Sequence, residues 1–274
     1  MKPERGVNPP VAMTIAGSDS GGGAGIQADL KTFAALGVFG TSVLTAVTAQ
    51  NTTSVLGVRR LEPEFVDLQI EAVLSDLPVA AVKTGMLASA AIVAVVARRA
   101  AAGELPHLVV DPVMVTSTGT PLLDDDAVAA YLELLLPHTT VCTPNMREAA
   151  LLTATEVTDL ASMESAARKI AEHGARVVVV KGGHFGGDQA PDVVLADGVM
   201  TVLVGPRVVS ANDHGTGCSL SSAIAAYLAR GADTLEAVAR AKAFVARAIE
   251  GAASWTLGAG HGPLDHFGWN APAQ

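Results

Sequence analysis

The sequence predicts one α/β domain with a central, mostly parallel sheet flanked by helices. Short apolar runs alternate with stretches of helical periodicity along the 274 residues, and this alternation indicates βαβ units. Hydrophobic residues make up 50% of the chain but aromatic residues only 4%, so small aliphatic side chains must build the core, as they do around buried parallel strands. No stretch resembles a linker or a low-complexity segment. We therefore expect a single domain over residues 1–274, with residues 1–10 as a flexible N-terminal extension.

In the first half of the chain, strands are predicted at 11–16, 42–49, 79–82 and 107–110, and helices at 26–36, 63–74 and 88–101. Apolar residues at 26, 30, 33 and 36 have helical spacing, and Gly37 is typical of a helix end. Pro63 suits the first turn of the second helix. Each strand is short and apolar, which is typical of a strand that is buried on both faces.

The second half repeats this alternation. Strands are predicted at 140–143 and 176–181, and helices at 124–136, 162–173, 218–229 and 234–252, with a further helix starting at 147–152. Two runs at 193–196 and 199–204 flank Asp197-Gly198, which indicates a β-hairpin.

Composition excludes several classes of protein. The formal net charge of -9 argues against a nucleic-acid binder, because phosphate contacts need Lys and Arg. No run approaches the roughly 20 apolar residues that a membrane span requires, and the N-terminus does not resemble a secretory signal. Cys142 and Cys218 are the two cysteines, too few for a disulfide scaffold, so we expect a reducing, cytoplasmic setting.

A glycine-rich segment, Gly17–Gly25, lies between the first strand and the first helix. Its backbone amides can approach a ligand closely, and the helix N-terminus favours anions. It lacks the Gly-Lys pair of a Walker loop. No Asp or Glu occurs between Asp29 and Glu62, where a dinucleotide site would need one for the ribose. A small-molecule loop is the favoured interpretation, and a flexible connection is the alternative.

Polar side chains follow three predicted strands. Asp111 ends the strand at 107–110 and is a candidate Mg²⁺ ligand, or a turn-forming Asp before proline. Asn145 and Glu148 open a helix, either near metal-bound phosphate or as a capping pair. Lys181 ends the strand at 176–181 and either meets phosphate or simply leaves the core.

The segment at 212–222 is the most informative one. Gly215, Thr216, Gly217 and Cys218 precede a long apolar helix, so their backbone N–H groups are predicted to form an anion hole for a phosphoryl group in transfer. A helix N-terminus also favours a thiolate, so we expect Cys218 to help activate a substrate hydroxyl. The alternative is a glycine-rich turn with a buried cysteine.

Several motifs occur in a fixed order: AGSDSGGGAGIQADLKTF, TAVTAQNT, KTGML, VVDPVM, TPNMREA, VVVKGGH and NDHGTGCSLSSAIAA. From Met13 to Phe267 this series resembles the hydroxymethylpyrimidine/phosphomethylpyrimidine kinases of the ribokinase-like superfamily. The resemblance implies the three-layer ribokinase-like fold, a homodimer, and two Mg-ATP reactions of thiamine biosynthesis. The first phosphorylates the hydroxymethyl group of 4-amino-5-hydroxymethyl-2-methylpyrimidine, and the second converts the monophosphate to the diphosphate.

The resemblance also implies roles for individual residues. In the pyrimidine pocket, Gln50 would bond to the aminopyrimidine edge and Met86 would cover the ring, and the other expected lining residues are Gly17, Ala24, Val113 and Asp29. On the phosphate side, Asp111 and Glu148 would serve Mg²⁺, Asn145 would lie near the nucleotide and Lys181 would contact ATP phosphate. Gly215–Cys218 would be the anion hole, with Cys218 where sugar kinases of the superfamily place an aspartate base.

Two alternatives stay open. A pyridoxal kinase of the same superfamily shares the GTGC signature and also acts on a hydroxymethyl group, although the TAVTAQNT context favours the pyrimidine. A non-catalytic pyrimidine-binding module is the second alternative. The combination of Asp111, Glu148, Lys181 and Cys218 argues against it, because a binder needs no metal and phosphate groups.

Overall fold

The computed structural model describes residues 8–114, 125–183 and 187–270. These residues form one nine-stranded sheet in the order β3-β2-β1-β4-β5-β6-β7-β8-β9. The strands are β1 (Val11–Asp19), β2 (Phe39–Gln50), β3 (Val55–Arg60), β4 (Val79–Thr84), β5 (Val109–Val110), β6 (Val141–Cys142), β7 (Val177–Lys181), β8 (Gln189–Ala196) and β9 (Val199–Pro206). The six central strands, in the order β2-β1-β4-β5-β6-β7, run parallel. β3 at one edge, and β8 and β9 at the other side of the sheet, pair antiparallel with their neighbours.

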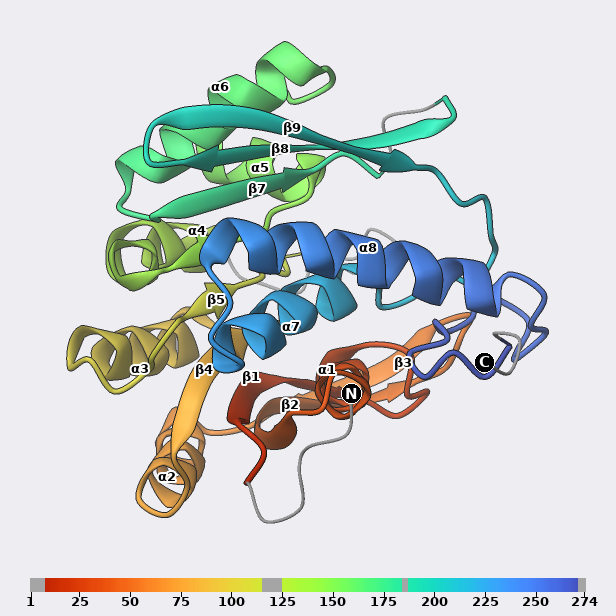
Figure 1. Ribbon diagram of the computed structural model, residues 1–274. Coiled ribbons are helices and arrows are strands. Elements are labelled where there is room, and N and C mark those ends of the chain that lie inside the picture. Colours follow the sequence, from red (N-terminus) through yellow and green to blue (C-terminus); the bar gives the residue numbers. More distant parts are fainter. Residues whose placement is uncertain (1–7, 115–124, 184–186, 271–274) are drawn as a thin grey trace.

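Helices cover both faces of the sheet (Figure 1). The helices are α1 (Gly25–Ala35), α2 (Pro63–Leu74), α3 (Ala90–Ala101), α4 (Asp125–Ala130), α5 (Met146–Thr153), α6 (Leu160–Glu172), α7 (Thr216–Ala229) and α8 (Thr234–Ala252). Buried side chains of α1, α7 and α8 share one apolar core, and those of α2, α3, α5 and α6 share the other. The three-layer α/β fold expected from the sequence is thereby confirmed. No helix of the described residues is long and apolar enough to cross a membrane.

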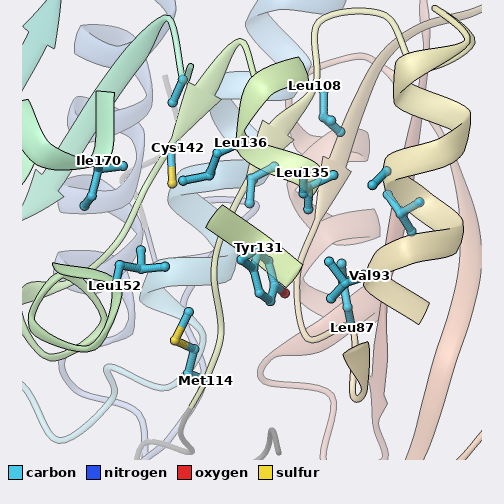
Figure 2. Packing of buried hydrophobic residues seen from close by; sticks show 14 of the residues in the cluster. Leu87, Val93, Leu108, Met114, Tyr131, Leu135, Leu136, Cys142, Leu152 and Ile170 are labelled. Atoms are coloured by element: carbon cyan, nitrogen blue, oxygen red, sulfur yellow. The ribbon is translucent and has the colours of Figure 1, made fainter. Parts of the chain in front are cut away.

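The second core closes around Tyr131, which is fully buried. Figure 2 shows its ring near Leu87 and Val93, with Leu135 and Leu136 beside it. The sequence predicted one helix over 124–136, but here the structure differs. After α4 the chain forms a wide π turn at Tyr131–Leu135 and then a 3-10 turn at Leu136–His138. Pro137 has no N–H for the helical ladder, so a regular α-helix cannot continue through it.

Two other differences concern strands. β3 was not predicted, because its residues are mostly exposed and so carry no core pattern; it pairs with the end of β2. The strand predicted at 107–110 is reduced to β5, because His107 has a positive φ of 44°. The Asp197-Gly198 hairpin is confirmed, with φ values of 48° and 76° that suit a type I′ turn. The predicted N-terminal extension includes residues 1–7, which lie outside the described residues; β1 starts at Val11.

The parallel strands bring their carboxyl ends to one edge of the sheet, where open α/β sheets bind ligands. Asp19, Gln50 and Lys181 are the last residues of β1, β2 and β7, and Asp111 directly follows β5. Polar side chains from distant parts of the sequence therefore meet at this edge.

Candidate active site

The partly exposed ammonium of Lys181 lies between two buried carboxylates at this edge. Lys181 Nζ is 2.8 Å from Asp111 Oδ1 and 3.8 Å from Glu148 Oε2. Burial raises the pKa of Glu148 to about 7, an effect that the Lys181 ammonium opposes and the Asp111 carboxylate reinforces. Burial works against the Lys181 ammonium, but the two carboxylates outweigh it and raise the pKa of Lys181. The lysine is therefore a fixed positive charge.

Asn145 and Glu148 form the capping pair that was one of their two predicted roles. Asn145 Oδ1 accepts a hydrogen bond from the Glu148 N–H at 2.9 Å, and Glu148 Oε2 accepts one from the Asn145 N–H at 2.7 Å. This capping box fixes the start of α5. It also holds the Glu148 carboxylate within reach of Lys181, so the capping role and a role on the phosphate side are compatible.

The N-terminus of α7 lies against the Lys181–Asp111 pair. A Cβ built on Gly217 would be 3.2 Å from Lys181 Nζ and 3.7 Å from Asp111 Oδ2. The sequence did not single out Ser221, one turn further along α7, whose hydroxyl lies 3.3 Å from Asp111 Oδ2. The helix N-terminus and its first amides thus face the same space as the ammonium, which is a favourable place for a phosphate group.

The glycine-rich loop is organised by Asp19. Its carboxylate accepts hydrogen bonds from the backbone N–H groups of Gly21 at 2.8 Å, Gly23 at 3.1 Å and Ala24 at 2.8 Å. Gly215 has a φ of 86°, and a Cβ there would collide with the Gly23 carbonyl oxygen. The absence of that Cβ lets the loop pack directly on the turn before α7, which brings Ala24 next to the predicted anion hole. The sequence did not single out Asp19, although a carboxylate directly before the segment SGGG could have indicated it.

The side chains predicted for a substrate pocket gather beside this loop. A Cβ on Gly17 would collide with the Met86 methyl group, so the two residues are in contact. The Gln50 carboxamide lies between Thr48 Oγ1 and His214 Nε2, 3.3 Å from each. Gln50, Ala24, Met86 and Val113 are all partly exposed, whereas Gly17 is buried. The expected pocket residues Gln50, Met86, Gly17 and Ala24 are therefore brought to one place.

A family comparison agrees with this geometry. The model of the phosphomethylpyrimidine kinase family matches residues 19–265. The chain belongs to this family. It is 50% identical over 261 residues to the hydroxymethylpyrimidine/phosphomethylpyrimidine kinase of Rhizobium meliloti (strain 1021), which covers 94% of this chain and 97% of that protein. It is 43% identical over 257 residues to the corresponding kinase of Escherichia coli (strain K12), covering 93% and 97%.

Solved structures of two kinds of kinase resemble the chain. The pyridoxal kinase of Staphylococcus aureus in complex with AMP-PCP and pyridoxal matches with a TM-score of 0.87 at 35% identity, over 97% of this chain and 96% of that one. The phosphomethylpyrimidine kinase of Clostridium difficile 630 matches with a TM-score of 0.77 at 40% identity, over 87% and 99%. The kinase described here is thus a phosphotransferase with the ribokinase-like fold.

The Cys218 thiol differs from its sequence-based expectation. Burial raises the pKa of the thiol to about 11; the Lys83 ammonium lowers it, and the Asp29 and Asp111 carboxylates raise it further. The helix N-terminus was expected to favour the thiolate, but desolvation and the nearby negative charges outweigh that effect. In the kinase without ligands, Cys218 is therefore a neutral thiol at pH 7.

Asp29 was expected to line the pocket, but it lies in the interior beneath it. Its side chain is fully buried and is paired with the equally buried Lys83 at 2.9 and 3.0 Å. Thr14 and Ser222 donate further hydrogen bonds to the same carboxylate. Through these contacts the Asp29 carboxylate ties β1, β4 and α7 together.

Proposed function

We propose that this kinase transfers the γ-phosphoryl group of Mg-ATP to the hydroxymethyl group of 4-amino-5-hydroxymethyl-2-methylpyrimidine, and then phosphorylates the monophosphate to the diphosphate, as in thiamine biosynthesis. Relatives named hydroxymethylpyrimidine/phosphomethylpyrimidine kinase support the substrates. A further relative, the thiamine biosynthesis bifunctional protein ThiED of Geobacter sulfurreducens, supports the pathway; the chain covers 52% of it at 48% identity.

One geometric observation carries the proposal. The N-terminus of α7 packs on one side against Lys181 and Asp111 and on the other against the glycine-rich loop. A phosphate group near Lys181 and an alcohol near Ala24 would therefore share the amides of Gly215–Cys218 between them. This is the arrangement that phosphoryl transfer needs, because its catalysis consists mainly of positioning and of stabilising charge.

Solved relatives with AMP-PCP and with ADP support ATP as the donor. The residues also fit Mg²⁺. Among the residues that the structure describes, no three His, Cys, Asp or Glu side chains form a metal cluster. Mg²⁺ in kinases, however, needs only one or two carboxylates in addition to phosphate oxygens and water. Asp111 and Glu148 are the carboxylates we propose for it, and bound Mg²⁺ would neutralise charge on the phosphates. Lys181 is proposed for the phosphates, with Asn145 near the nucleotide.

The test is an assay of the purified kinase with Mg-ATP and, in parallel, the pyrimidine alcohol, its monophosphate and pyridoxal, read by mass spectrometry of the products. We expect the pyrimidine diphosphate from both pyrimidine substrates. No turnover of either pyrimidine would overturn the proposal.

Pyridoxal kinase activity is the second candidate. The solved pyridoxal kinase of Staphylococcus aureus overlays on almost the whole chain, which supports it. Formation of pyridoxal phosphate alone would favour this activity and would leave the proposed roles on the phosphate side in place.

We also propose that the kinase is a cytoplasmic homodimer that folds as a single domain. Exposed apolar side chains on β2 and β3 support the dimer, with Val47, Leu56 and Val58 exposed by 43%, 77% and 37%. Cys142 and Cys218 are both free, which suits a reducing compartment. Sedimentation analysis would test the dimer, and charged substitutions at Leu56 and Val58 are expected to release monomers.

A further inference from the structure

His214 joins three segments that are far apart in the sequence. It precedes the anion-hole turn, and its Nε2 atom lies 3.0 Å from Asp19 Oδ2, at the end of β1. The same nitrogen lies 3.3 Å from Gln50 Nε2, at the end of β2. The imidazole also packs on Gly23, where a Cβ would meet the ring. Its side chain is only 13% exposed, so its orientation is fixed by these neighbours.

The proton on this imidazole can be assigned from its partners. Asp19 is an acceptor: its carboxylate receives three backbone N–H groups. Although burial opposes ionisation, the hydrogen bond with His214 and the backbone N–H groups outweigh it and lower the pKa of Asp19. Beside a carboxylate, Nε2 must carry hydrogen. The Gln50 atom that faces this N–H is Nε2, which is also a donor. Turning the carboxamide by 180° brings its oxygen to this place, where it can accept from the imidazole.

A second neighbour leads independently to the same orientation of the amide. The Thr48 hydroxyl has one proton and donates it to the Ser18 carbonyl oxygen at 2.9 Å. The Gln50 atom 3.3 Å from this hydroxyl is Oε1, which is itself an acceptor. With its one proton given to Ser18, the hydroxyl can only accept from Gln50, so it requires the amide NH₂ group in the place of Oε1. The oxygen and nitrogen of an amide have nearly the same shape, and their hydrogen-bond partners decide which is which. Both partners are satisfied when the carboxamide is turned by 180° from its placement in the structure, so that Gln50 Oε1 faces His214 and Nε2 faces Thr48.

We infer that His214, held by Asp19, is a positioning residue that fixes which end of the Gln50 carboxamide is the acceptor and which is the donor. This inference rests on the proposed function. One lone pair of Oε1 and one N–H of Nε2 stay available for a ligand, in a fixed order. Such an amide matches an amino group beside a ring nitrogen, which an aminopyrimidine has and pyridoxal does not. His214 thereby favours the pyrimidine alcohol over pyridoxal.

Two substitutions distinguish the effect of the His214 hydrogen bond from the effect of the shape of its ring. His214→Phe keeps a flat ring on Gly23 and removes the N–H, whereas His214→Gln places an amide N–H close to the position of Nε2. We expect H214F to raise the KM for the pyrimidine alcohol about tenfold, the effect of losing one well-placed hydrogen bond. The KM for ATP should change by less than about twofold, and H214Q should restore most of the loss.

A double-mutant cycle with Gln50→Ala tests whether His214 acts through Gln50. Q50A alone should raise the KM for the pyrimidine alcohol and lower the preference over pyridoxal, and H214F should add little to it. If H214F raises this KM by the same factor in the Q50A background, or changes only the KM for ATP, the inference is wrong. Circular dichroism of each variant separates these outcomes from a loss of folding.

A measurement without turnover keeps the inference distinct from the proposed function. ¹⁵N NMR of the histidine side chains at pH 8 should show the His214 proton on Nε2, with H214F identifying the signal. A His214 ring with a bare Nε2 would overturn the inference even in an active kinase. If the wild-type protein phosphorylates neither pyrimidine, the proposed function fails, and calorimetric binding of the pyrimidine alcohol to wild type and H214F replaces the KM comparison.

Discussion

The Lys181 ammonium lies 2.8 Å from Asp111 Oδ1, at the point where the end of β7 meets the N-terminus of α7. The two residues are 70 positions apart in the sequence, and only the parallel order of β5, β6 and β7 brings them together. A cation beside two carboxylates is held in place before any ligand arrives, so it costs no reorganisation when negative charge develops.

Removing this cation should affect both catalysis and stability. We expect Lys181→Met to lower kcat by about 10²–10³-fold, the usual effect of losing one preorganised group at a developing charge. Because Asp111 is left buried without its partner, the free energy of unfolding should fall by about 3–5 kcal/mol. Steady-state kinetics and urea denaturation measure the two effects. Lys169→Met, at an exposed position on α6, is the control and should match the wild type. A K181M variant with wild-type kcat would remove the phosphate role.

Glu148 should make stability depend on pH in an unusual direction. Its pKa is raised by burial from 4.5 to about 7, so between these values the folded state binds more protons than the unfolded state. The contribution of Glu148 to the free energy of unfolding is present in full below pH 4.5. It is lost as the pH rises through 7, by about 3 kcal/mol in total. Glu148→Gln keeps an acceptor for the capping box and should flatten this dependence.

Urea denaturation of metal-free protein from pH 5 to pH 8 tests the expectation for Glu148. Glu172→Gln, near the exposed end of α6, should keep the wild-type slope. A wild-type protein whose stability rises over this range, with E148Q showing the same slope, would contradict it.

Cys218 should react as a neutral thiol. With a pKa raised to about 11 by burial, its thiolate fraction is small at pH 7, so alkylation by iodoacetamide should be slow and should still be accelerating above pH 9. Peptide mass spectrometry locates the label, and Cys218→Ala should abolish it. The fully buried Cys142 should stay unlabelled in the native protein. A rate that levels off by about pH 10 would show an ordinary, unshifted thiol.

The same variant tests the catalytic role of Cys218. If Cys218 accepts the proton of the substrate hydroxyl, it must do so as its thiolate. C218A should then lower kcat by about 10²–10⁴-fold and change the KM for the pyrimidine alcohol far less. Turnover equal to wild type would leave phosphoryl transfer to the backbone amides of the turn alone.

The Asp29–Lys83 pair should act through stability. Asp29→Asn leaves a buried ammonium without its counter-ion, so we expect a loss of about 3–5 kcal/mol in the free energy of unfolding. The KM of the folded fraction should stay within about twofold of wild type, because Asp29 does not reach the pocket. The double variant Asp29→Leu/Lys83→Met should recover much of the stability. If D29N instead raised the KM for the pyrimidine alcohol without loss of stability, Asp29 would be a pocket residue after all.

Local sequence patterns determined most elements of this protein. The helices at 63–74 and 234–252 were predicted with the bounds that the structure has, because Pro63 and the apolar period mark them locally. The Asp197-Gly198 turn was predicted for the same reason, since its left-handed backbone needs such residues. The alternation of strands and helices placed Asp111 and Lys181 at strand ends. Gln50 followed from the resemblance of the motifs to a known family.

Only the tertiary structure decided what surrounds each of these residues. Whether a carboxylate is paired with a buried lysine depends on strands far away in the sequence, and this is why the pairing of Asp29 with Lys83 was not predicted. The raised pKa of Cys218 arises from desolvation and from charges on other elements, which a local helix-terminus argument cannot include. Asp19 lies at the end of a strand and His214 just before a helix. They meet because Gly23 packs closely on Gly215. Motifs and periodicity are properties of short segments, whereas burial and electrostatic fields sum over the whole fold.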